Sequence, residues 1–206
     1  MKAPGHSRGG GGFRHNSTAR IPIANVPIAP VVYLAYGSNL HPLRLGERIA
    51  SARLVDVIAL PGWRLRFHKR GVDDSAKCNL VRTGNAADRA WGALFTLDPA
   101  ERETLDRFEG PGYAVQALEV NTRGAPVEAF VYIARDTHLD DAGLPYDWYR
   151  DIVLAGARHL ELPADYVAAI AAVQARPDPD PARAAQHAAL LDRLHAHTRG
   201  VPRGRP

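Results

Sequence analysis

The order of apolar and polar positions divides the chain into a front part rich in strands and a rear part rich in helices. The apolar run VVYLAY at residues 31–36 predicts a buried strand. Trp63, Leu65 and Phe67 alternate with two arginines, which is the period of a half-buried strand. Similar patterns predict strands at 53–60, 78–82, 90–97, 113–120 and 126–134, the last two forming a hairpin around NTRGA.

Helical periodicity predominates in the last third of the chain. Helices are predicted at residues 146–160, 163–173 and 181–194, and shorter ones at 41–49 and 98–109. In the helix that begins at 98, Asp98 suits the N-cap, Pro99 the first turn, and Glu101 the acidic position of a capping box. Strands followed mostly by helices predict an α+β domain.

Composition changes at both ends suggest three regions. Residues 1–30 are rich in Gly, Pro and Ser without periodicity, and we expect a disordered basic tail. Residues 31–175 form the expected folded domain. Residues 176–206 comprise the linker RPDPD, a helix and a basic tail.

The charge balance argues against nucleic acid as a partner. The chain of 206 residues has a net charge of +4. Residues 1–30 hold four basic side chains and no acid, so residues 31–206 sum to zero, whereas a nucleic-acid groove needs a basic body. No window resembles a membrane span. The single cysteine, Cys78, excludes an intrachain disulfide and favours a reducing compartment, which predicts a cytoplasmic protein.

The loop after the first predicted strand has the residue types of an anion-binding turn. Gly37 permits close approach to the backbone, and Ser38 and Asn39 can cap a following helix. Backbone N–H groups at such a helix start can bind an anion or a developing oxyanion. An ordinary strand-to-helix turn explains the same residues equally well.

Glu109 lies where a carboxylate is electrostatically disfavoured. It ends the helix predicted at 98–109, and the negative end of the helix dipole costs a carboxylate roughly 0.3–1 kcal/mol. Phe108 and Tyr113 could give it an apolar environment. Both effects raise a carboxyl pKa towards that of a general base. The alternative is a solvated glutamate at a helix end.

Other reactive side chains carry weaker signals. Cys78 lies in a short apolar strand and is expected in the core. His195 and His197 lie in a segment expected to fray, without further zinc ligands, so we predict no metal site. Tyr149 is expected to pack in the core with its hydroxyl paired.

Three segments together resemble the γ-glutamylcyclotransferase family, including its AIG2-like members. They are YLAYGSNL at 33–40, FEGPGY at 108–113 and YRDIVLAGARHLELP at 149–163, and the resemblance covers about residues 31–175. It implies a small mixed β-barrel flanked by α-helices. It implies that the loop holds a γ-glutamyl group, that Glu109 is catalytic and that two tyrosines line the pocket. The implied binding residues are Tyr36, Gly37, Ser38, Asn39, Leu40, Tyr113 and Tyr149.

The implied reaction is an intramolecular aminolysis that yields 5-oxoproline and a free amine from a γ-glutamyl amino acid or amine. The substrate supplies its own nucleophile, so a single carboxylate can take a proton from the α-ammonium and return it to the leaving amine. We therefore expect no cofactor or metal, a small-molecule γ-glutamyl substrate, and a monomer or homodimer. A non-catalytic module that binds a γ-glutamyl compound on the same fold is the alternative. The basic ends lie outside the resemblance, and the amine side of the substrate stays open.

Overall fold

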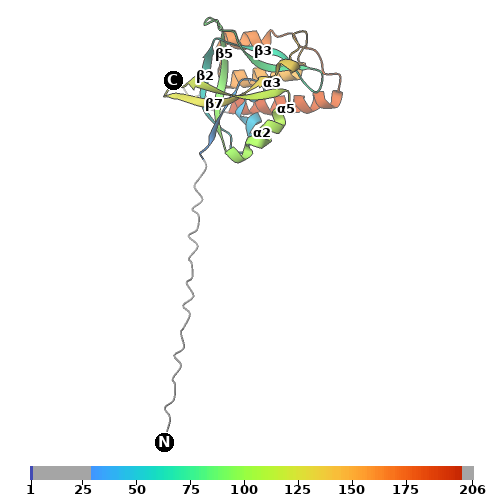
Figure 1. The fold of residues 1–206 in the computed structure, drawn as a ribbon. Coiled ribbons are helices and arrows are strands. Elements are labelled where there is room, and N and C mark those ends of the chain that lie inside the picture. Colours follow the sequence, from blue (N-terminus) through green and yellow to red (C-terminus); the bar gives the residue numbers. More distant parts are fainter. Residues whose placement is uncertain (2–28, 201–206) are drawn as a thin grey trace.

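The computed structural model describes Met1 and residues 29–200 (Figure 1). The predicted disorder of residues 1–30 and the basic end at 201–206 therefore lie almost entirely outside the described residues.

The main sheet has five strands and mixed pairing. Its order is β2 (Arg53–Pro61), β5 (Arg89–Leu97), β1 (Val31–Ala35), β7 (Pro126–Ala134) and β6 (Tyr113–Asn121). The central strand β1 pairs antiparallel with β5 and parallel with β7. The predicted hairpin of β6 and β7 is confirmed, with Tyr113 opposite Ala134 and Asn121 opposite Pro126.

The predicted barrel is not closed within the described residues. Strands β3 (Trp63–Arg70) and β4 (Ala76–Arg82) form a separate two-stranded sheet beside the curled main sheet. Gly62, with φ of 78°, redirects the chain between β2 and β3, and the two strands then pair with different partners. The α+β class is confirmed, but the strands form two sheets.

A bulge in β3 breaks its predicted alternation. Register shifts between Phe67 and Lys69, and the two consecutive residues His68 and Lys69 are both buried. A β-bulge inserts one residue and turns the side chains that follow it. The bulge thus turns the Lys69 side chain into the interior of the protein rather than into solvent.

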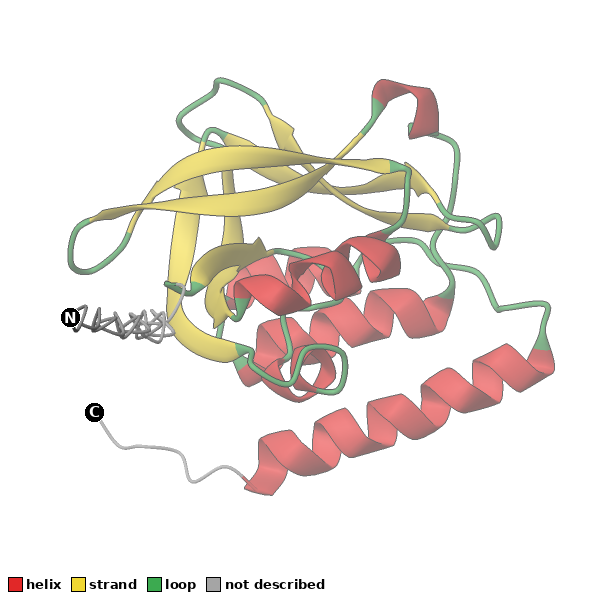
Figure 2. Ribbon diagram, turned by 60° about the horizontal axis from the view of Figure 1, so that its bottom comes forward, coloured by secondary structure: helices red, strands yellow, loops and turns green. Residues whose placement is uncertain are grey.

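Most of the helices lie to one side of the strands, with α5 outermost (Figure 2). Their bounds are α1 (Pro42–Gly46), η1 (Pro99–Glu101), α2 (Arg102–Glu109), η2 (Asp136–His138), α3 (Asp147–His159), α4 (Ala164–Ala171) and α5 (Pro181–Gly200). The helix predicted at 41–49 is shorter, and that predicted at 98–109 is divided into η1 and α2. Helix α3 packs against both α4 and α5. No helix among the described residues has the length and apolarity needed to cross a bilayer.

The predicted N-cap at Asp98 is confirmed, but the predicted capping-box role of Glu101 is wrong. The Asp98 side chain accepts from the Ala100 N–H at 2.9 Å, as an N-cap does. Glu101 turns away from it and accepts from the Ala50 and Ser51 N–H groups at 3.1 and 2.9 Å. These donors belong to a distant turn, so tertiary structure replaces the local contact.

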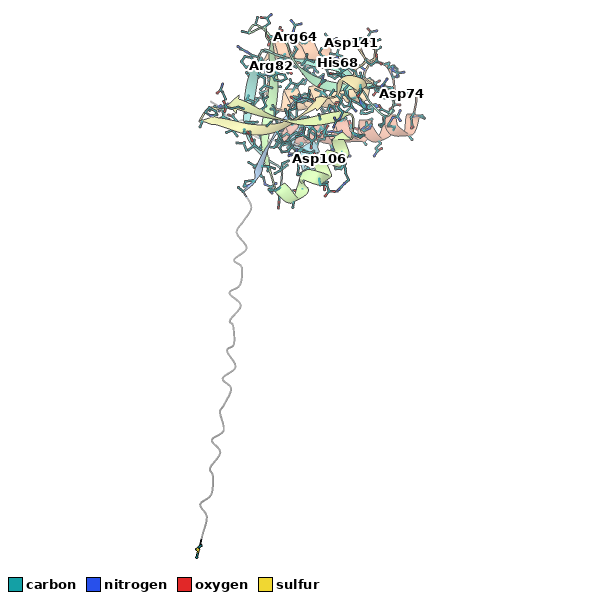
Figure 3. All side chains as sticks on the ribbon, viewed as in Figure 1. Arg64, His68, Asp74, Arg82, Asp106 and Asp141 are labelled. Carbon is teal, nitrogen blue, oxygen red and sulfur yellow. The ribbon has the colours of Figure 1, made fainter. Side chains whose placement is uncertain are left out.

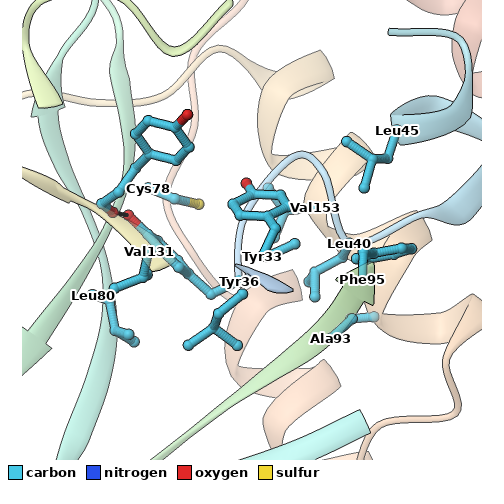
Figure 4. Close-up of a cluster of buried hydrophobic side chains, with 14 of the residues drawn as sticks. Tyr33, Tyr36, Leu40, Leu45, Cys78, Leu80, Ala93, Phe95, Val131 and Val153 are labelled. Carbon is cyan, nitrogen blue, oxygen red and sulfur yellow. Dashed lines mark hydrogen bonds between the residues drawn. The ribbon is translucent and has the colours of Figure 1, made fainter. Parts of the chain in front are cut away.

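The core brings β1, its following loop and α3 together. Figure 4 shows Tyr33 and Leu40 among the buried side chains, with Val153 of α3 beside them. A Cβ at Gly156 would lie 2.6 Å from Leu40 Cβ and 2.9 Å from the His41 backbone nitrogen. Glycine in α3 therefore lets the helix press directly on the loop that follows β1.

Candidate active site

The loop at residues 36–40 is held between β4 and α3. A Cβ at Gly37 would lie 2.9 Å from Cys78 Cβ on β4, closer than packed side chains allow. Gly156 of α3 supports the other side of the loop. Packing against Cys78 is therefore sufficient to explain the glycine at position 37.

Backbone N–H groups of this loop are available to a ligand. The Leu40 N–H donates to the Gly37 carbonyl at 3.0 Å and closes the turn. Within residues 29–200, the N–H groups of Gly37, Ser38 and Asn39 donate to no protein acceptor. Consecutive N–H groups of this kind can stabilise a negative oxygen.

Asn39 connects the loop to Glu109 at the end of α2. Its Nδ2 donates to Glu109 Oε1 at 2.8 Å and lies 3.2 Å from the Tyr33 hydroxyl. Arg48 donates to Asn39 Oδ1 at 3.0 Å. The amide is therefore fixed at both ends, and it orients one carboxylate oxygen of Glu109.

Burial is the largest influence on Glu109, and it raises the pKa of this carboxyl above its usual value. The positive charges of Arg48, Arg44 and Lys69, and then the Asn39 hydrogen bond, act in the opposite direction. Phe108 does not shield the group as expected, because its ring is 52% exposed and lies under Arg48. A raised pKa makes a carboxyl a stronger base, which suits a group that takes and returns a proton.

Three of the tyrosines that line the narrow pocket around Glu109 are fixed by hydrogen bonds to the backbone. Tyr149 accepts from the Cys78 N–H at 3.1 Å, and Tyr113 donates to the Cys78 carbonyl at 2.7 Å. Tyr36 donates to the Tyr132 carbonyl. Burial raises the pKa of Cys78 to about 12, so its thiol stays neutral and is no nucleophile.

The pocket gathers nearly all of the residues that the sequence singled out. Its lining includes Tyr36, Gly37, Ser38, Asn39, Glu109, Tyr113 and Tyr149. Leu40 is fully buried and lies outside this lining. Sequence reasoning missed Tyr33 and Tyr132, which also line the pocket, because an aromatic residue on a strand is not distinguished from core.

A wider cavity of about 240 Å³ adjoins the narrow pocket and shares Ser38, Glu109, Tyr113 and Tyr149 with it. The narrow part measures only about 20 Å³, so an organic ligand would extend into the wider cavity. The cations that line this outer cavity are Arg44, Arg48, Lys69 and Lys77. Sequence reasoning missed them; the i, i+4 spacing of Arg44 and Arg48 was the signal available for that pair.

A second polar cluster lies apart from this pocket, where Figure 3 labels His68 and Asp141. His68 Nδ1 lies 2.8 Å from Asp141, and its Nε2 lies 3.0 Å from Asn79 Nδ2. Asn79 Oδ1 accepts from the Ala134 N–H at 2.9 Å. Both ring nitrogens are engaged, so this cluster joins β3, β4 and β7 structurally.

The three histidines His41, His159 and His197 form the candidate metal centre of the described residues, with ligand atoms within 4.8 Å of one another. The expectation that the segment holding His197 frays is wrong, because α5 continues to Gly200. This helix brings His197 beside the rings of His41 and His159. His41 Nδ1 accepts from the Leu43 N–H, and its Nε2 lies 3.2 Å from Thr198 Oγ1, as His159 Nδ1 does at 3.0 Å. These contacts satisfy His41 without an ion, and the cluster acts as a helix cap and a link between helices.

Comparisons with known proteins agree with this fold. A sequence model of the AIG2-like family matches residues 89–170. The γ-glutamylcyclotransferases of Homo sapiens and Mus musculus are each 27% identical over 150 residues, which is 69% of this chain and 78% of theirs.

Solved structures show the same fold. A γ-glutamyl cyclotransferase superimposes with a TM-score of 0.67 and 20% identity, over 80% of this chain and 99% of that one. An uncharacterized protein from Homo sapiens superimposes with the same TM-score and coverage at 21% identity. The chain thus has an α+β fold shared with these structures. In sequence this chain is similar to γ-glutamylcyclotransferases, and its residues 89–170 match the AIG2-like family.

Proposed function

We propose that this protein is a γ-glutamylcyclotransferase that converts a γ-glutamyl amino acid or amine into 5-oxoproline and the free amine. One observation carries the proposal. The Glu109 carboxyl accepts a hydrogen bond from Asn39 and lines the same pocket as residues 37–39, whose N–H groups donate to no acceptor in the described part of the chain. The single buried cysteine suits a cytoplasmic location.

In the proposed reaction the substrate's α-ammonium gives a proton to Glu109. The free α-amine then attacks the γ-carbonyl, and a new C–N bond closes the five-membered ring. The negative charge on the carbonyl oxygen is stabilised by backbone N–H groups of residues 37–39. Glu109 returns this proton to the leaving nitrogen and takes the second proton from the nitrogen of the forming ring as the original C–N bond breaks. That second proton passes from Glu109 to the released amine, which leaves as an ammonium ion. Two protons therefore pass from the α-ammonium to the leaving amine through Glu109, without a second base.

Tyr113 and Tyr149 are proposed to shape the pocket around the folded substrate. Their hydroxyls are both engaged with the Cys78 backbone, which fixes the rings. Rigid walls favour the conformer in which amine and carbonyl meet, and such positioning lowers the barrier of an intramolecular attack.

The test is release of 5-oxoproline from γ-glutamyl dipeptides, γ-glutamyl amines and glutathione. We expect turnover by the wild type and a loss of about 10²–10⁴-fold in Glu109→Gln, the contribution typical of general acid–base catalysis. Glu103→Gln is the matched control, because it changes an 86% exposed glutamate of the same helix. Turnover by Glu109→Gln within tenfold of the wild type would refute the assigned role.

The alternative, a binding module without turnover, predicts a different pair of results. A γ-glutamyl compound would raise the melting temperature in proportion to its concentration over its dissociation constant and would be recovered unchanged.

A further inference from the structure

The outer cavity carries an excess of positive charge. Arg44, Arg48, Lys69 and Lys77 face two carboxylates there, those of Asp73 and Glu109. Asp73 lies 2.7 Å from Lys77 Nζ, so these two charges compensate each other. Three cations remain opposite one carboxylate, and that carboxylate is the proposed acid/base.

Two of these cations are buried without an ion-pair partner in the described part of the chain. Arg44 is 7% exposed, and its Nε donates to no acceptor in the described part of the chain. Lys69 is 6% exposed, and its Nζ lies 4.7 Å above the Tyr113 ring, with no ion pair within residues 29–200. Burying an unpaired charge is costly, and an anionic ligand in the cavity would offset that cost.

Helix α5 adds a third donor from outside the segment that resembles the family. His187 lies on the cavity wall, and its Nδ1 is buried without a hydrogen-bond partner. The ring stacks on Trp148 at a centroid distance of 3.7 Å and an interplanar angle of 17°. Stacking fixes the ring, so Nδ1 is held in place for a ligand in the cavity.

We propose that the outer cavity binds a carboxylate carried by the leaving amine, with Lys69, Arg44 and His187 as its specificity-determining residues. This inference rests on the proposed function. Since Glu109 stands where the narrow pocket meets the outer cavity, the bond to be broken lies at that junction and the leaving amine points outward. The favoured substrates are γ-glutamyl amino acids or peptides with a free carboxylate, rather than γ-glutamyl amides or diamines.

A matched pair of substrates tests this, namely γ-glutamylglycine and γ-glutamylglycinamide, which differ only in the leaving-group carboxylate. We expect kcat/KM of the wild type to be at least about tenfold higher for the acid, as one charge-assisted hydrogen bond provides. Lys69→Met and His187→Ala should each reduce this ratio by lowering turnover of the acid more than that of the amide. His195→Ala, an exposed histidine of the same helix, should leave the ratio unchanged.

Two kinetic outcomes would overturn the proposal. One is equal kcat/KM of the wild type for acid and amide. The other is an equal loss for both substrates in Lys69→Met and His187→Ala, because the cations would then hold the α-carboxylate that all γ-glutamyl compounds share. Circular dichroism of each variant separates both outcomes from misfolding.

Equilibrium binding keeps this inference separate from the proposed function. If neither compound yields 5-oxoproline, the proposed function fails, and calorimetric titration of the same pair still tests the cavity. Tighter binding of the acid to Glu109→Gln, with the difference lost in the double variant Glu109→Gln/Lys69→Met, supports the carboxylate subsite. Equal binding of the pair, or no binding of either, overturns it.

Discussion

The chemistry of the site depends on how one side chain, Glu109, is solvated. Burial raises its pKa, and three nearby cations together with Asn39 only partly reverse that effect. The charged carboxylate is thus less stable in the folded protein than in the unfolded chain. A reactive group of this kind costs conformational stability, as strained or desolvated active-site groups commonly do.

Glu109→Gln should therefore change the pH dependence of stability. In the wild type the raised pKa of Glu109 contributes stability below the unfolded value of about 4.3, and this contribution is lost as pH rises through the folded value. Glutamine does not titrate. The melting temperature of Glu109→Gln minus that of the wild type should increase from pH 4 to pH 8.

Glu103→Gln is again the control, since Glu103 is exposed on the same helix. A difference between Glu109→Gln and the wild type that stays constant from pH 4 to pH 8 would contradict a raised pKa at Glu109.

Among the elements, α5 contributes more to the structure than its sequence indicated. Its composition predicted a helix beyond a linker, in a region separate from residues 31–175. In the structure Leu190 and Leu194 are buried, and α5 packs on α3 while His187 reaches the outer cavity. One helix therefore both covers apolar surface and supplies a wall of the candidate site.

Leu194→Ala should destabilise the protein by about 2–5 kcal/mol, because Leu194 is fully buried and its removal leaves a cavity. Urea unfolding measures the loss. Asp192→Ala changes an exposed residue two positions earlier in the same helix, and its stability should stay within about 0.5 kcal/mol of the wild type. Equal stability of the two variants would show that α5 does not pack on α3 in solution.

At the scale of the whole molecule, histidines join elements that are far apart in the chain. His41 begins α1, His159 ends α3 and His197 lies near the end of α5. Burial, followed by the neighbouring rings of His159 and His197, lowers the pKa of His41 to about 3. Protonation of this cluster is thus coupled to the docking of three helices.

His41→Asn should make stability less sensitive to acid. A depressed histidine pKa gives stability that is complete above the unfolded value of about 6.5 and is lost as pH falls towards the folded value. Between pH 7.5 and 5 this loss amounts to about 2 kcal/mol in the wild type. The asparagine keeps a capping side chain but does not titrate.

Urea unfolding of wild type and His41→Asn at pH 5 and pH 7.5 measures this effect. The expected result is a lower stability of the variant at pH 7.5 and a smaller change between the two pH values. An unaltered pH dependence would contradict a neutral, buried His41.

The sequence by itself determined the local features of this protein. Apolar periodicity placed the strands and helices, since burial of one face requires that period. The segments around Tyr36–Leu40, Glu109 and Tyr149 indicated the resemblance to γ-glutamylcyclotransferases and most residues of the narrow pocket. Such features depend on neighbours along the chain, or on motifs that can be read without coordinates.

Tertiary structure alone decided which distant groups meet. The bulge that buries Lys69, the separate β3–β4 sheet and the approach of His187 and His197 arise from strand register and helix docking, which the local pattern does not specify. The glycine at position 37 shows the same limit: its sequence context indicated a ligand, whereas its neighbour in space is Cys78. Local sequence thus supplied the reactive groups, and long-range packing decided their burial, their pKa and the groups that they contact.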